Sequence, residues 1–112
     1  MNAPLPLLKG TLDTVVLKAL AEAPMHGFEI TTWLEARAGG PLDVTDSALY
    51  QALYRMEERG LVEAEWGTSD HNRRARYYRL TGVGRRHLKE ETARLVRFTQ
   101  ALHRILLAPG KA

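Results

Sequence analysis

The sequence contains no cysteine, which excludes disulfide frameworks, zinc ribbons, iron–sulfur sites and thiol catalysis. It also lacks a run of about 18 apolar residues, the length that a membrane-spanning helix requires. The first residues, MNAPLPLLKG, show no charged region followed by an apolar stretch and a small-residue cleavage site. We therefore expect neither export nor membrane insertion, and a cytoplasmic location fits the lack of cysteine.

Motifs of common enzyme sites are missing as well. The sequence has no glycine-rich phosphate loop, no nucleophile elbow and no paired-carboxylate arrangement. The four histidines stand apart, and only His87 with Glu90 or Glu91 has a helical spacing that could hold a metal ion on one face. We therefore predict that the protein is not an enzyme and has neither a cofactor nor a metal site.

The 112 residues, 45% hydrophobic and 26% charged, have the length and composition of one globular domain. Their charge is uneven, because residues 1–70 hold 5 basic and 11 acidic residues whereas residues 71–89 hold 7 basic residues and no acidic one. A basic stripe in an otherwise acidic chain is expected where a protein contacts a phosphate backbone. On charge alone, a solvated loop whose arginines aid solubility explains the stripe equally well.

Three helices are predicted in the first 60 residues. Apolar side chains recur every three or four positions over residues 11–23, which indicates an amphipathic first helix. The second helix follows and ends at Gly39, a residue suited to a left-handed helix terminus. The third has Thr45 or Asp46 as its N-cap and ends at Gly60.

The third helix has two different sides, since residues three or four apart share a side. Its apolar side, which we expect to be buried, comprises Leu49, Ala52, Leu53 and Met56. Its polar side comprises Ser47, Tyr50, Gln51, Tyr54, Arg55 and Glu58. The polar side mixes aromatic with hydrogen-bonding groups and could contact a partner. Alternatively, each tyrosine packs against a neighbouring helix and leaves only its hydroxyl in water.

From Leu61 the hydrophobic pattern changes to a period of two, which predicts two strands joined by the turn sequence GTSDHNRR. The arginines gather at the tip of this hairpin and on its returning strand. Trp66 and Tyr78 could stack on single-stranded bases, but we expect both to belong to the core.

The remaining chain, from Thr81 or Gly82 to Leu107, is predicted to form one long helix. Most of a heptad seam is present, formed by Leu88, Leu95, Phe98, Leu102 and Ile105. A helix of some 25 residues is ~37 Å long. This is longer than a compact domain of this size could cover with its own residues. We expect a second copy of the chain to cover the seam, and a partly frayed surface helix is the alternative. Val96, Leu106 and Leu107 lie off the seam and are expected to pack on the first helix of either copy, with the partner's helix preferred.

Three helices, a hairpin with a basic tip and a long terminal helix are the elements of a winged helix-turn-helix protein with a dimerisation arm. The chain resembles PadR-type transcriptional regulators in LLKGTLDTVVLKAL, PMHGFEI, SALYQALYRMEERGLVEAEWG and RRARYYRLTGVGRRHL, which cover most of residues 7–88. Its single terminal helix is similar to the compact branch of that family. The predicted fold is mainly α (α+β), with a winged helix-turn-helix domain over residues 1–81 and a dimerisation helix over 82–112.

The resemblance implies a cytoplasmic bacterial repressor that binds a palindromic DNA operator as a homodimer, with release by a small molecule as a further expectation. Multidrug-sensing relatives use a tryptophan of the last helix to stack flat ligands. Here the last helix contains no tryptophan and offers only Phe98 for stacking, which argues against a similar drug pocket. Many relatives have proline where this chain has Gln51, a side chain able to read adenine.

Three groups of residues are predicted to form the contacts with DNA and with the second copy. Base reading is assigned to Gln51 and Arg55 with Tyr50, Tyr54 and Ser47; backbone contact to Asn72, Arg73, Arg74 and Arg76; and the dimer interface to Leu88, Leu95, Phe98, Leu102 and Ile105. Two reading helices about one DNA turn apart, ~34 to 36 Å, would demand a palindromic site. The alternative function is a winged-helix protein–protein interaction module whose basic hairpin meets an acidic partner.

Overall fold

The computed structural model describes residues 3–8 and 10–110. Its elements in chain order are β1 (Leu5–Pro6), α1 (Leu12–Glu22), α2 (Gly27–Ala38), β2 (Leu42–Asp43), α3 (Asp46–Glu58), β3 (Val62–Thr68), β4 (Arg74–Leu80) and α4 (Gly82–Leu107). The predicted mainly helical α+β fold is confirmed, with three helices, an antiparallel hairpin and one long final helix. The short parallel pair β1 and β2 was not predicted, because two-residue strands show no hydrophobic period.

Local capping fixes where the second and third helices begin. The Glu29 backbone N–H donates to His26 Nδ1 at 3.3 Å, and the His26 N–H donates to Glu29 Oε1 at 3.1 Å, which forms a capping box at the start of α2. At the start of α3, the Ala48 N–H donates to Thr45 Oγ1 at 3.0 Å. Gly39 ends α2 in the left-handed conformation, with φ of 79°. These local contacts define both ends of α2 and the start of α3.

The core lies where α1, α2 and α3 meet the base of the hairpin. The predicted apolar side of α3 is buried throughout, and it packs with Val16, Leu17 and Ile30. Tyr78 is fully buried as predicted, and its backbone N–H and carbonyl pair with Met25 in the link between α1 and α2.

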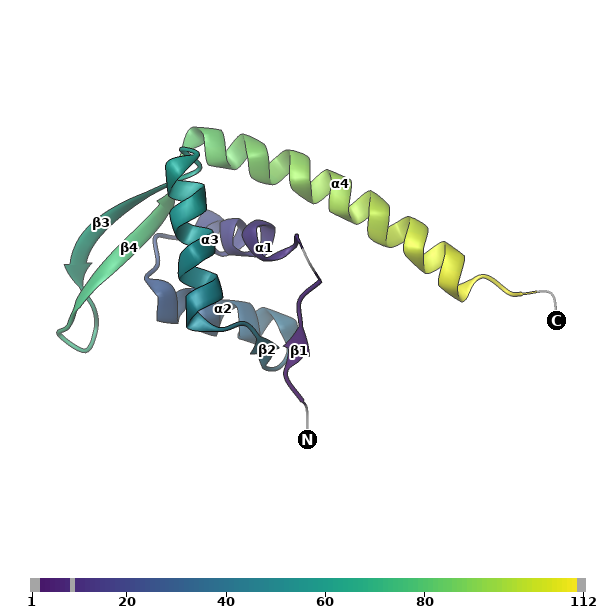
Figure 1. The fold of residues 1–112 in the computed structure, drawn as a ribbon, viewed down its shortest axis with the longest axis horizontal. Helices are drawn as coiled ribbons and strands as arrows, with labels where there is room; N and C mark the ends of the chain where they lie inside the picture. Colours follow the sequence, from purple (N-terminus) through teal and green to yellow (C-terminus); the bar gives the residue numbers. More distant parts are fainter. Residues whose placement is uncertain (1–2, 9, 111–112) are drawn as a thin grey trace.

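The prediction that Trp66 belongs to the core is wrong, since its side chain is 57% exposed. Trp66 pairs with Arg76 on β4, whereas the deeply buried Tyr78 pairs with Ala64, nearer the base of the hairpin. The helices cover the hairpin at its base and leave the part toward the tip in solvent (Figure 1).

Helix α4 begins against the core and then extends away from the other elements, while the hairpin extends on the other side of α3 (Figure 1). The Cα radius of gyration is 16.1 Å, compared with about 13 Å for a compact chain of this length. The first turns of α4 pack against α1 and β4. Val96, Leu106 and Leu107 are exposed, so α1 of the same chain does not cover them as the off-seam prediction allowed. Among the described residues, every helix is too short or too polar to cross a membrane.

Candidate nucleic-acid interface

The polar side of α3 faces away from the core. Ser47, Gln51, Tyr54 and Arg55 are exposed, and Tyr50 is partly buried. The ring of Tyr50 lies over Gly27 at the start of α2, so close that a Cβ on this glycine would overlap the Tyr50 hydroxyl. Burial raises the pKa of Tyr50, with a further contribution from Asp46. Tyr50 therefore helps to fix α3 on α2, while the half-exposed Tyr54, with its ring centroid 6.4 Å from that of Tyr50, remains accessible.

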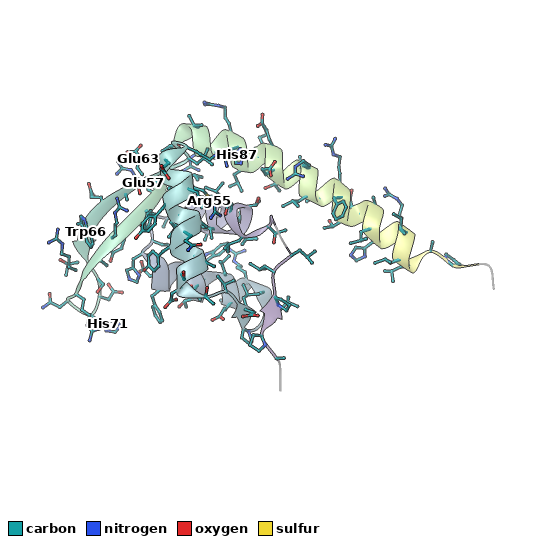
Figure 2. All side chains as sticks on the ribbon, in the orientation of Figure 1. Arg55, Glu57, Glu63, Trp66, His71 and His87 are labelled. Carbon is teal, nitrogen blue, oxygen red and sulfur yellow. The ribbon has the colours of Figure 1, made fainter. Side chains whose placement is uncertain are left out.

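Arg55 is already engaged within the protein. Its Nη2 lies 2.9 Å from Oδ1 of Asp13, in the first turn of α1, while its side chain stays 56% exposed. The sequence analysis missed Asp13, because a pair 42 positions apart on two helices leaves no periodic signal. Figure 2 shows Arg55 on α3, on the same helix as Glu57.

The tip of the hairpin is a tight turn that carries the predicted backbone contacts. Asn72 adopts a left-handed conformation with φ of 57°, and its N–H donates to the Ser69 carbonyl at 2.9 Å. Arg73 and Arg74 are exposed beside it, and the ion pairs of the described residues include neither of them. The Arg74 guanidinium lies 4.7 Å from the centroid of the Trp66 ring.

Arg76 differs from these two arginines because it connects the hairpin to α3. Its Nη2 donates to Glu57 Oε2 at 2.9 Å and its Nη1 donates to the Tyr78 hydroxyl at 3.3 Å. The side chains of Arg76 and Glu57 are each about one-third exposed, at 31% and 32%. Arg76 is thus held in place by internal contacts, whereas Arg73 and Arg74 project from the tip.

A hollow of about 520 Å³ lies between the polar side of α3, the start of α2 and the hairpin. Its walls are mostly aromatic and carry two guanidinium groups; the side chains are His26, Phe28, Tyr50, Tyr54, Trp66, Arg74, Ala75, Arg76 and Tyr78. The hollow therefore joins two tyrosines of the predicted reading side of α3 to two of the predicted backbone-contacting arginines, Arg74 and Arg76. In Figure 2, Trp66 and His71 lie on the hairpin and Arg55 on α3.

The five seam residues occupy one helix but have different surroundings. Leu88 packs against the core of its own chain. Leu95 and Leu102 are partly buried, whereas Phe98 and Ile105 are 57% and 74% exposed. The structure therefore places the most accessible part of the seam in the second half of α4. Among residues 3–8 and 10–110, no three His, Asp or Glu side chains gather in a group that could hold a metal ion.

Comparisons with known proteins agree with this architecture. Residues 16–90 match the Transcriptional regulator PadR-like family. The structure is similar to that of a PadR family transcriptional regulator from Eggerthella lenta DSM 2243, which is 30% identical over 90% of this chain and 86% of that chain, with a TM-score of 0.72. A PadR-like transcription factor from Bacteroides fragilis is 28% identical over 87% of this chain and 91% of that chain, with a TM-score of 0.69.

A third structure supports the fold alone. The PadR-like transcriptional regulator from Bacillus cereus strain ATCC 14579 is 24% identical over 91% of this chain and 97% of that chain, with a TM-score of 0.78. The family match spans well over half of the sequence, from α1 into α4. The chain therefore belongs to the PadR-like family of transcriptional regulators, which are DNA-binding proteins rather than enzymes.

Proposed function

We propose that this regulator is a repressor that binds a palindromic duplex operator as a homodimer, with α3 in the major groove and the hairpin on the flanking backbone. The observation that carries the proposal is the hollow in which Tyr50 and Tyr54 of the polar side of α3 lie beside Arg74 and Arg76 of the hairpin. In helix-turn-helix proteins, residues near the start of the recognition helix contact base edges. Ser47 and Gln51 occupy that part of α3.

Sequence reading is assigned to Gln51 and Arg55. A glutamine amide can pair with adenine and a guanidinium with guanine, each good pair giving ~1 to 3 kcal/mol of discrimination. Arg55 would exchange the carboxylate of Asp13 for the base edge. Tyr50, Tyr54 and Ser47 would contact phosphate or a thymine methyl group.

The deciding experiment compares operator with random DNA. We expect wild-type protein to shift a duplex that carries the promoter region upstream of its own gene. Gln51→Ala with Arg55→Ala should lower the ratio of operator to random affinity about tenfold or more, as expected for lost base pairing. The control, Thr32→Ala with Arg37→Ala on exposed positions of α2, should keep the ratio. An unchanged ratio in the α3 variant would rule out this reading side, and a folded wild type without duplex binding would favour the protein–protein interaction module.

The hairpin should supply affinity with little sequence information, since phosphates are the same along any duplex. Arg73 and Arg74 are the exposed partners for phosphate, and Asn72 shapes the turn beside them. Arg76 would contact the DNA backbone while it keeps its ion pair with Glu57. Arg73→Ala and Arg74→Ala should each weaken operator and random DNA together and flatten the salt dependence by ~0.9 in log–log slope. If the salt slope of these variants equals that of wild type, the two arginines do not contact phosphate and belong to a solvated loop.

Dimerisation is assigned to α4, with residues 1–81 as the DNA-binding unit and 82–112 as the arm. Burying each large seam side chain is worth ~1.5 to 3 kcal/mol, and the second half of the seam lacks cover in its own chain. An effector would enter between the arms and the DNA-binding units, where a shift of the arms changes the spacing of the two α3 helices.

Sedimentation tests the dimer. Leu95→Asp with Leu102→Asp should give monomers or unfolded chains that lose operator binding. Arg97→Asp with Arg104→Asp places two carboxylates at the same seven-residue spacing on exposed positions of α4, and this control should stay dimeric. A folded wild-type monomer at micromolar concentration that binds a palindrome with full affinity would contradict the dimer.

A further inference from the structure

Two large apolar side chains stand in solvent at the rim of the hollow beside α3. Phe28 is 73% exposed and Trp66 is 57% exposed, although the first lies at the start of α2 and the second on β3. Leaving such side chains in water forgoes the stabilisation that burial would bring. Several aromatic groups exposed together on one surface mark a place where a partner binds.

The other walls of the hollow indicate the charge of this partner. Arg74 and Arg76 contribute two guanidinium groups, and the lining includes no carboxylate. Tyr50 and Tyr54 of α3 line the same hollow, so it continues directly into the polar side of that helix. A ligand that combines apolar surface with regularly spaced negative charge matches these walls.

We propose that this hollow is an apolar binding site for the sugar–phosphate backbone of duplex DNA, in which Trp66 and Phe28 pack on deoxyribose and Arg74 meets the adjoining phosphate. The inference rests on the proposed DNA contact and adds a non-ionic component to it. Deoxyribose presents the C–H surface of the backbone, whereas the base faces are stacked inside the duplex.

Internal contacts hold this site ready before DNA arrives. The Trp66 ring lies under the Arg74 guanidinium at 4.7 Å, which orients both groups. The Arg76–Glu57 ion pair joins the hairpin to α3, and the capping box fixes His26 beside Phe28. A wall that is already ordered loses little side-chain freedom on binding, so more of the contact energy appears as affinity.

Salt dependence separates an apolar contact from an ionic one, because only the ionic contact releases counterions. Trp66→Ala and Phe28→Ala should each weaken operator and random duplex by the same factor, about tenfold. Their salt slopes should equal that of wild type. Arg74→Ala should instead flatten the slope by ~0.9. Circular dichroism should show the wild-type fold in all three variants, because the substituted side chains are exposed.

The other tryptophan–arginine pair among the described residues provides a matched control. Arg37 lies 4.7 Å above Trp33 on α2, outside the hollow, so Arg37→Ala should leave DNA affinity and salt slope unchanged. In a Trp33→Phe background Trp66 is the one remaining tryptophan of the two in the sequence. Its fluorescence should change when operator or random duplex is added.

Three results would overturn the inference. The first is wild-type DNA affinity in Trp66→Ala and Phe28→Ala. The second is a salt slope that flattens in these two variants as it does in Arg74→Ala. The third is a loss confined to operator DNA, which would assign the aromatic groups to a base. If wild-type protein binds duplex but these variants do not differ from it, the inference alone fails. If wild-type protein binds no duplex, the proposed function fails with it.

Discussion

Gly84, in the first turn of the long helix α4, lies close to the backbone of Leu61. It is buried, and a Cβ at this position would overlap the carbonyl oxygen of Leu61 and lie 2.9 Å from Cδ1 of Leu80. The Leu61 carbonyl has little freedom to move, because it accepts hydrogen bonds from both the N–H and the Oγ1 of Thr81, each at 3.1 Å. Gly84→Ala must therefore displace backbone.

The size of the effect follows from two opposing contributions. Replacing a helical glycine by alanine ordinarily raises the free energy of unfolding by ~0.5 to 1 kcal/mol. Overpacking typically costs ~1 to 3 kcal/mol, and a clash with backbone belongs to the upper part of that range. We therefore expect Gly84→Ala to lower the free energy of unfolding by ~1 to 2 kcal/mol.

Urea denaturation followed by far-ultraviolet circular dichroism measures this change, with all proteins at one concentration because a dimer would link stability to concentration. Gly82→Ala is the matched control, since its Cβ would have no atom within 4 Å and it lies in the same helix. This control should be as stable as wild type or slightly more so. Equal denaturation midpoints for the two variants would refute the steric argument.

Two further predictions concern an ion pair and a buried phenol. Asp13→Asn should remove the ion pair with Arg55 and raise the affinity for random DNA. Glu22→Gln removes the same charge from α1, but Glu22 pairs with Arg37 of α2 rather than with α3, so its effect should be smaller. Equal changes in both variants would show that only net charge matters. Burial raises the pKa of Tyr78, so its stabilising contribution is complete below about pH 10 and is lost as pH rises through the folded-state pKa. The free energy of unfolding should thus fall more steeply above this pH in wild type than in Tyr78→Phe, and parallel curves would contradict the assignment.

Helix ends and the buried side of α3 could be predicted from the sequence because their signals are local. Thr45 caps α3 through a residue three positions away, and Gly39 ends α2 through its own backbone conformation. The period of 3.6 residues likewise separates the apolar from the polar side of α3 without knowledge of any partner element.

The hairpin shows where local pattern is insufficient. A period of two assigns residues to the faces of a strand, but it does not say how far along the strand the covering helices reach. Tyr78 and Trp66 look alike as aromatic strand residues, yet Tyr78 pairs with Met25 at the covered base and Trp66 lies beyond it. The aromatic rim of the hollow could therefore not be predicted.

Sequence alone determined the order of the four helices and the hairpin, the basic segment and the apolar seam of α4, since each depends on residues close together in the chain. Tertiary structure decided which charged groups meet. Asp13 reaches Arg55 and Glu57 reaches Arg76 only because folding brings α1 and the hairpin against α3. Such contacts depend on distances between elements, and one-dimensional spacing does not encode them.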